Sequence, residues 1–180
     1  MATKLGLKSN EVRVVPYHPK WKKEFAKVKK NLMQHTNLQD NQVEHIGSTA
    51  ITGIHSKPII DILVGIGDYS SVSDSLAKGL RNAGFYRLRV ERPNEIVFAK
   101  FTDNSYQVKT HFIHLVDFGG ELWNNLIFFR DYLNSNEEAK REYEELKLEY
   151  TKQTSQGVNE YTDHKEAFVK KIFAMSNSKN

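Results

Sequence analysis

Residues 44–66 read EHIGSTAITGIHSKPIIDILVGI, and this stretch decides the fold that we predict. Residues 59–66 form an apolar run whose length and β-branched content are typical of a buried strand. Residues 42–46 have the character of another strand, and the polar segment 49–56 between the two has the composition of a loop. A single carboxylate, Asp61, interrupts the apolar run.

The segments on either side of this pair predict further helices and strands. Apolar residues at helical spacing predict a helix over 18–35, and a serine cap and a glycine stop bound a second helix over 70–83. The remaining segments with strand character are 12–15, 85–90, 95–101 and 106–116.

From Gly120 onward we expect only helices, with a break over 154–157. Three apolar stripes support them: Leu122, Leu126, Phe129 and Leu133; Ala139, Tyr143, Leu146 and Tyr150; Tyr161, Phe168, Ile172 and Met175. Strands followed by helices indicate an α+β fold. We predict a mixed, mainly antiparallel sheet with helices packed on it, in one domain spanning 1–180 with a core of about 12–175.

Composition narrows the classes of function. The chain has 180 residues and no cysteine, which excludes disulfides, thiol nucleophiles and cysteine-ligated zinc. No segment is apolar enough for a membrane helix or an export signal, so we expect a cytoplasmic protein. The net charge of +4 permits an anionic ligand. The early lysines are interpreted as one solvated helix face, so nucleic acid is not the expected partner.

The residues Gly47, Ser48 and Thr49 form the first candidate site. Glycine lets a ligand approach the backbone closely, and the next two residues offer hydroxyl and N–H groups to a phosphate. A buried carboxylate at Asp61 requires a partner or a metal. The alternative interpretation is an ordinary turn beside an acid that is hydrogen-bonded within the protein.

Taken together, this pattern resembles the nucleotidyltransferase superfamily, and the segment HIGSTAITGIHSKPIIDI resembles the GrpB family in particular. PYHPKW at 16–21, THFIHLV at 110–116 and FFRDYL at 128–133 agree with the GrpB resemblance, which covers roughly residues 12–175. It implies that Gly47 and Ser48 hold nucleotide phosphates. It also implies an Asp-x-Asp pair and a third acid that bind Mg²⁺. GrpB proteins are sometimes fused to dephospho-CoA kinase, which implies a CoA-like ligand as well.

The sequence departs from the superfamily at the second acid, because that position is Leu63. His114 lies on the strand where the resemblance implies the third ligand. We expect Asp61 and His114 to be catalytic residues and ligands of a divalent cation, either Mg²⁺ or, given the nitrogen ligand, Mn²⁺ or Zn²⁺. The alternative is that His114 is a buried, hydrogen-bonded histidine. Whether His45 and His111 join the cluster is left open by strand alternation.

Three basic residues are candidate phosphate contacts: Lys57, Arg130 and Lys147. Lys57 directly follows the loop, and Arg130 interrupts the apolar side of its helix. An ion pair with Asp131 is the alternative for Arg130, and a solvated side chain is the alternative for Lys147.

Two functions from different classes follow, both with a nucleotide or phosphorylated small molecule as the partner. The first is an enzyme that transfers a nucleotidyl or phosphoryl group with help from a metal. The second is a degenerate fold that binds a nucleotide or CoA-like ligand without turning it over, which Leu63 favours. An RNA-binding accessory protein is a weaker third, because no aromatic and basic residues are interleaved as in RNA-recognition motifs.

Overall fold

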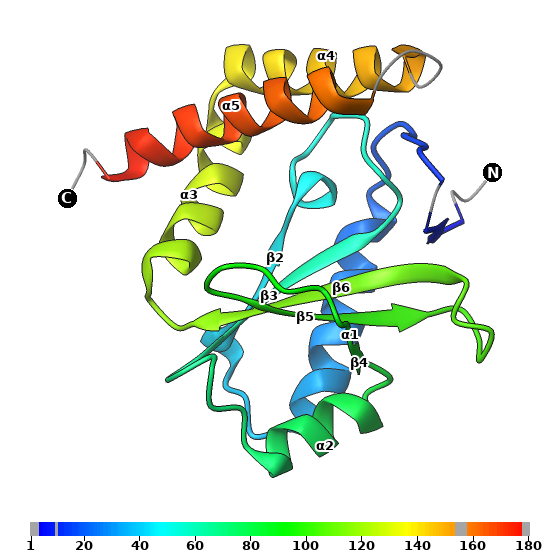
Figure 1. Cartoon of the computed structure of the whole chain (residues 1–180), viewed down its shortest axis with the longest axis vertical. Helices are drawn as coiled ribbons and strands as arrows, with labels where there is room; N and C mark the ends of the chain where they lie inside the picture. The colour runs from blue at the N-terminus through cyan, green and yellow to red at the C-terminus, as the bar shows by residue number, and fades with distance from the viewer. Residues whose placement is uncertain (1–3, 10, 154–157, 178–180) are drawn as a thin grey trace.

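The computed structural model describes residues 4–9, 11–153 and 158–177. Its strands form one sheet in the order β2-β3-β6-β5-β4, and β1 pairs with β6 (Figure 1). Only the β3–β6 pair is parallel among the named strands; the other pairs are antiparallel. The predicted mixed, mainly antiparallel sheet is therefore confirmed. The strands are β1 Leu7–Lys8, β2 Val43–Ile46, β3 Ile60–Ile66, β4 Tyr86–Arg87, β5 Ile96–Phe101 and β6 Val108–Asp117.

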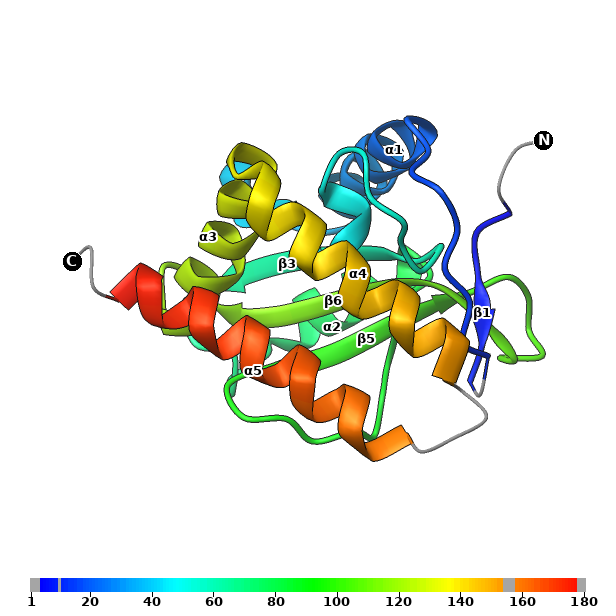
Figure 2. The same cartoon turned by 90° about the horizontal axis from the view of Figure 1, so that it is seen from above.

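In the described residues, five α-helices pack on the two faces of the sheet (Figures 1 and 2). Helices α1 and α2 pack on one face, whereas α3 packs on the other and is joined there by α4 and α5. The helices are α1 Lys20–His35, α2 Asp74–Asn82, α3 Glu121–Ser135, α4 Glu137–Gln153 and α5 Val158–Asn177. Two short 3₁₀ turns, Asp40–Gln42 and Ser48–Ala50, flank β2.

The largest core cluster lies between the sheet and helices α1 and α2. Trp21, Val28 and Leu32 of α1 are buried against it, as the helical spacing predicted. Helix α2 begins at Asp74 rather than near Ser70, because the hydroxyl of Ser73 accepts a hydrogen bond from the N–H of Leu76 and caps the helix there.

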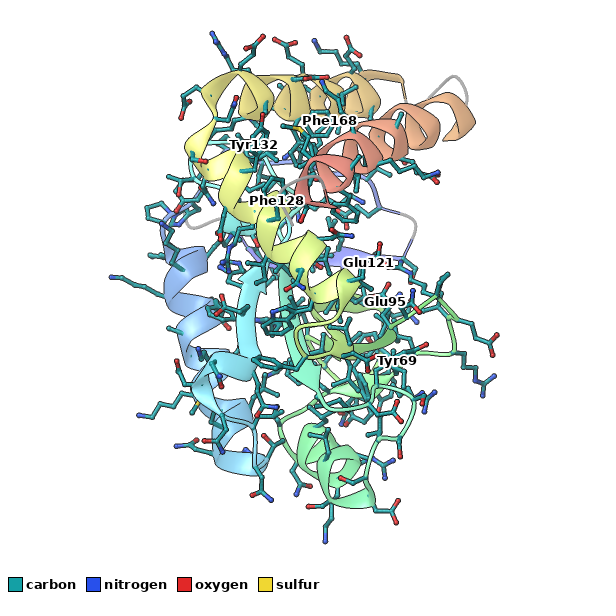
Figure 3. The ribbon with its side chains drawn as sticks, turned by 90° about the vertical axis from the view of Figure 1, so that its left-hand side faces the viewer. Tyr69, Glu95, Glu121, Phe128, Tyr132 and Phe168 are labelled. Atoms are coloured by element: carbon teal, nitrogen blue, oxygen red, sulfur yellow. The ribbon has the colours of Figure 1, made fainter. Side chains whose placement is uncertain are left out.

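The opposite face of the sheet carries two apolar clusters. The first joins Leu63 of β3 to Trp123 of α3. The second joins α3, α4 and α5 through Phe129, Tyr143 and Phe168. Figure 3 shows Phe168 in this unit, with Phe128 and Tyr132 on α3. The space between this helical unit and the sheet holds the candidate site.

Several boundaries differ from the sequence prediction. Residues 12–15 contribute only an isolated bridge between Val15 and Ser56 instead of a strand. The strand predicted over 85–90 shrinks to β4, because the chain leaves the sheet after Leu88 donates to Val97. The predicted helix break over 154–157 lies outside the described residues.

Strands β2 and β3 are adjacent, with Ile46 opposite Asp61, which confirms the predicted placement of Gly47 beside the Asp61 strand.

Across the part of the chain that the structure describes, no helix combines the length and the apolar character needed to cross a membrane.

Candidate functional site

A cleft of about 540 Å³ lies between the sheet and helices α3, α4 and α5. Its floor is formed by β3, β5 and β6, and its walls by the loop before β5 and by the three helices. The polar residues that line it are Ser48, Lys57, Asp61, Arg92, Lys109, His114, Tyr143 and Lys165. Apolar lining comes from Val97, Phe112, Leu126, Phe129 and Phe173, among others. The cleft therefore combines an apolar wall with ionisable groups.

Gly47 lies at the point where β2 ends beside Asp61. Its φ of +70° is a conformation that glycine adopts far more readily than other residues. A Cβ at this position would overlap the carboxylate of Asp61. The turn Ser48–Ala50 then carries the chain away from the sheet. Glycine is required here both for the backbone conformation and for the close approach of Asp61.

His114 lies between two carboxylates on the cleft face of the sheet. Its Nδ1 is 2.7 Å from Oε2 of Glu95, and its Nε2 is 3.4 Å from Oδ1 of Asp61. Val97 pairs with His114 across β5 and β6, and Glu95, two residues earlier, lies on the same face. Nη1 of Arg92 is 3.3 Å from Oε1 of Glu95 and extends the chain of contacts.

The two carboxylates keep His114 protonated. Burial alone would lower the pKa of His114, but the hydrogen bonds and charges of Asp61 and Glu95 outweigh burial and raise this pKa to about 9. Burial alone would raise the pKa of Glu95, but His114 and Arg92 hold it below its ordinary value. At neutral pH the cleft therefore contains an imidazolium clamped by two acids.

Four cationic side chains from different elements line the same cleft: Lys57, Arg92, Lys109 and Lys165. Burial, then the charge of Lys57, lowers the pKa of Lys165, and the charge of Arg92 adds to this effect. Among the described residues, neither Lys57 nor Lys165 forms an ion pair. The charges of Lys57 and Arg92 are thus close enough to Lys165 to repel it.

The structure brings some of the predicted site residues together in the cleft and places others elsewhere. Gly47, Ser48, Lys57, Asp61 and His114 line it. Thr49 is fully buried, and its hydroxyl lies 3.0 Å from Nε2 of His45.

Arg130 and Lys147 have partners within the protein. Arg130 bonds Glu44, Asp131 and the carbonyl of His45, so it ties α3 to β2. Lys147 is buried and donates to the carbonyl of His55, and its Nζ lies 4.4 Å from the ring centroid of Tyr143 in a cation–π contact. Burial, then the charge of Lys165, lowers the pKa of Lys147 to about 7. Neither residue lines the cleft, and their phosphate contacts stay predictions.

His45 and His111 lie on the other face of the sheet from Asp61. His45 pairs with Ile62 and stacks on Phe25 of α1, with ring centroids 4.8 Å apart. His111 pairs with Ile60 and faces α1 as well. Sequence alternation left their positions open, and the register settles them. Neither histidine can join Asp61 and His114 around one ion.

The residues present do not fit the two-carboxylate metal site of the superfamily. Leu63 is fully buried in the apolar cluster under α3, where a second acid would be required. Among the described residues, no group of three or more His, Asp or Glu side chains could hold an ion. The metal predicted at Asp61 and His114 has no complete ligand set here.

Sequence reasoning missed Glu95, Arg92, Lys109 and Lys165. Glu95 could not be found because the register of the β5–β6 hairpin is not readable from composition. Lys165 did carry a signal. It stands four residues after Tyr161 and three before Phe168, which places a lysine on the apolar stripe of α5.

A strand ending in Gly-Ser beside an Asp-bearing strand, under a cap of helices, defines a nucleotidyltransferase-like α+β domain. The Cid1 poly(U) polymerase, in a structure bound to MgATP, shares this fold with a TM-score of 0.52 and 15% identity over 80% of this chain and 46% of its own. The crystal structure of GrpB from Enterococcus faecalis matches with a TM-score of 0.75 and 28% identity, covering 93% of this chain and 98% of that one.

The family model described as GrpB protein matches residues 11–175. The glutamate-rich protein GrpB of Alkalihalophilus pseudofirmus is 41% identical over 169 residues, which cover 93% of this chain and 97% of that protein. The chain belongs to the GrpB family.

Proposed function

We propose that this GrpB protein binds a phosphorylated small molecule, a nucleotide or a CoA-like ligand, in the cleft and does not turn it over. One observation carries the proposal. Four cationic side chains line the cleft that holds the Asp61–His114–Glu95 chain, while Leu63 fills the place of the second catalytic acid. A cationic cleft without the metal-binding acids suits the binding of an anion better than its transfer.

Electrostatics support a phosphate as the anionic group. Lys165 is partly buried, and burial first, then the charges of Lys57 and Arg92, lowers its pKa. An incoming phosphate relieves that repulsion and forms charge-assisted hydrogen bonds with the same side chains. His114, as an imidazolium, adds a positive charge at the floor of the cleft, while its two ring nitrogens face Asp61 and Glu95.

The apolar lining supports a ligand with an organic body rather than a free anion. Val97, Phe112 and Phe129 offer surface to a base or an acyl-like chain, and ligand sites commonly pair apolar walls with a few polar groups. The cleft volume of about 540 Å³ lies in the range of roughly 300–1,000 Å³ that small-molecule sites occupy.

Metal-assisted nucleotidyl transfer is the competing function. It is favoured by the shared fold with Cid1, which is an argument from fold alone. Mg²⁺ in such sites is held by one or two carboxylates together with substrate phosphates and water. Asp61 offers one carboxylate, Glu95 is committed to His114 and Arg92, and Leu63 offers none.

The test is a thermal-denaturation screen with ATP, CoA and inorganic pyrophosphate, each with and without Mg²⁺. The proposal predicts that ATP or CoA stabilises the protein without Mg²⁺. At 100 times the dissociation constant, the gain is about 2.7 kcal/mol. Stabilisation that appears only with Mg²⁺ would favour the enzyme, and no stabilisation by any of the three compounds would contradict the binding proposal.

A further inference from the structure

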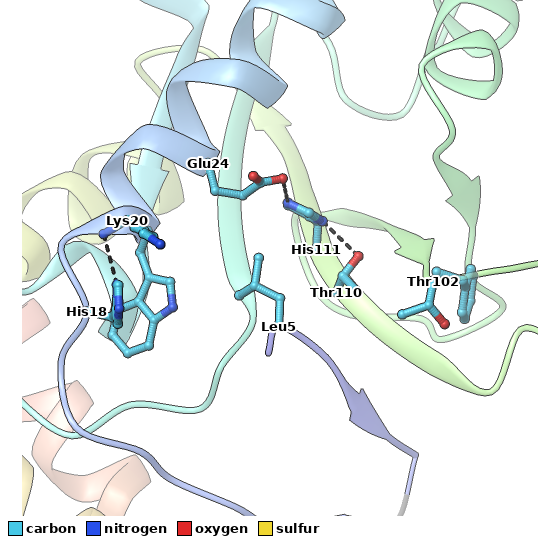
Figure 4. A pocket seen from close by; sticks show the side chains of 9 residues that line it. Leu5, His18, Lys20, Glu24, Thr102, Thr110 and His111 are labelled. Atoms are coloured by element: carbon cyan, nitrogen blue, oxygen red, sulfur yellow. Dashed lines mark hydrogen bonds and ion pairs between the residues drawn. The ribbon is translucent and has the colours of Figure 1, made fainter. Parts of the chain in front are cut away.

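A second cavity, of about 400 Å³, lies on the opposite face of the sheet from the cleft. It is enclosed by the N-terminal segment, the start of α1, the end of β5 and the start of β6 (Figure 4). None of its lining residues belongs to the cleft described above.

A β-bulge builds the polar end of this cavity. The β5–β6 register shifts between Lys100 and Phe101, because Lys100 pairs with His111 whereas Phe101 pairs with Lys109. Thr110 is therefore the extra residue. Its hydroxyl lies 2.8 Å from Nδ1 of His111, so two neighbours that a regular strand would separate act together (Figure 4). Bulges of this kind commonly re-aim side chains at functional sites.

The hydrogen bonds of Thr110 fix the tautomer of His111. Thr110 has one hydroxyl hydrogen and donates it to the carbonyl of Lys100, at 3.2 Å. Nδ1 of His111 must then carry the hydrogen of the bond between the two side chains. Burial, then the charge of Lys100, lowers the pKa of His111 to about 4, so the ring is neutral at pH 7. Its Nε2 therefore carries no hydrogen and can only accept a hydrogen bond.

This acceptor faces a second acceptor. Oε1 of Glu24 lies 3.4 Å from Nε2 of His111 (Figure 4). A carboxylate and an unprotonated ring nitrogen cannot bond each other, and His111 Nε2 is buried with no hydrogen-bond partner. The indole N–H of Trp21, which lines the same cavity, is a buried donor that also has none. Among the described residues, these are two of the three such buried side-chain atoms.

We propose that this cavity binds a neutral small molecule bearing a primary amide on an apolar body. An amide NH₂ group has two hydrogens for the two acceptors, Glu24 and His111, and its carbonyl accepts from the indole of Trp21. The apolar body lies against Leu5 and Phe101.

A neutral donor fits better than an ammonium group. Lys20 lines the cavity, and the charges of Lys27 and Lys100 act on His111, so the surroundings are already cationic. Glu24 is the one acid among the lining residues, so an ammonium ligand would add a positive charge to a cavity with a single negative one.

The probe is benzamide, and acetophenone is its matched control because it replaces the NH₂ group by a methyl group of similar size. The chain has two tryptophans, so two indole N–H resonances appear in an ¹⁵N–¹H correlation spectrum, and Trp21→Phe assigns them. We expect benzamide to shift the Trp21 signal saturably and to leave that of Trp123 in place. We expect acetophenone to bind about tenfold more weakly, or roughly 1.4 kcal/mol.

Variants and a charged probe complete the test. Glu24→Gln should weaken benzamide binding at least fivefold, whereas the exposed Glu137→Gln on α4 should leave it unchanged. An unmoved Trp123 signal shows that each variant is folded. Equal binding of benzamide and acetophenone, tighter binding of benzylamine, or no saturable shift by benzamide would each overturn the proposal.

Discussion

The carboxylate of Asp61 packs against the Cα of Gly47, so closely that a methyl group at position 47 would overlap it. The contact follows from the antiparallel pairing of β2 with β3, which sets Ile46 opposite Asp61. It joins the strand end that carries Ser48 to the acid that holds His114. A change at Gly47 therefore acts on the whole floor of the cleft.

Gly47→Ala should destabilise the protein more than Gly53→Ala. Both glycines have positive φ, +70° and +89°, but a Cβ at Gly53 meets nothing within 4 Å. Gly53→Ala should therefore cost only the backbone strain, about 1 kcal/mol. Gly47→Ala adds the overlap with Asp61, for a total on the order of 2–4 kcal/mol. Urea unfolding of both variants measures the difference. Equal losses would mean that Asp61 moves away freely.

The stabilising contribution of protonated His114 should be lost as pH rises from about 6.5 to 9. Its folded pKa, about 9, is above the ordinary value of 6.5, so its contribution is full below 6.5 and is lost through 9. The loss is on the order of 2–3 kcal/mol. Lys147 acts in the opposite direction over part of this range, because its folded pKa of about 7 lies below the ordinary value of 10.5.

The measurement is therefore the difference in unfolding free energy between the wild type and His114→Gln at each pH, in which Lys147 cancels. We expect the advantage of the wild type to shrink from pH 6.5 to 9. A difference that stays constant with pH would show that Asp61 and Glu95 do not hold a proton on His114.

Leu63→Asp should not create a metal site. Leu63→Ala should cost about 2–5 kcal/mol, because it leaves a cavity in the cluster under α3. Leu63→Asp should cost more, because it also buries a carboxylate. Calorimetry with Mg²⁺ should give negligible heat for the wild type, Asp61→Asn and Leu63→Asp. Tight Mg²⁺ binding by the wild type or by Leu63→Asp would contradict this prediction. If Asp61→Asn then binds no Mg²⁺, metal-assisted nucleotidyl transfer would become the better supported function.

Much of the fold was predictable because the spacing of apolar residues along the chain indicates which faces of helices and strands are buried. Trp21, Val28 and Leu32 mark α1, and the apolar run around Asp61 marks β3. The short strands were not predictable. The two-residue strand β1 has no pattern of its own and depends on pairing with β6, which tertiary structure alone decides.

The candidate site was predictable only in part. Local sequence identified Asp61 and Gly47, since a lone acid in an apolar strand and a Gly-Ser turn are visible in the chain. Glu95 depends on the hairpin register, and the bulge at Thr110 breaks the alternation that sequence reasoning assumed. The sequence suggested the ion pair of Arg130 with Asp131, which the structure contains, but not the second one with Glu44, 86 residues away.

The most direct test of the binding proposal is a calorimetric titration with ATP, without metal, of the wild type, Lys165→Met and Lys170→Met. Both lysines are on α5, but Lys165 lines the cleft whereas the side chain of Lys170 is 73% exposed and paired with Glu166. We predict that Lys165→Met weakens ATP binding at least tenfold, or about 1.4 kcal/mol, and that Lys170→Met leaves it unchanged. Equal affinities in all three proteins, or no ATP binding by the wild type, would contradict the assignment of the cleft as a phosphate-ligand site.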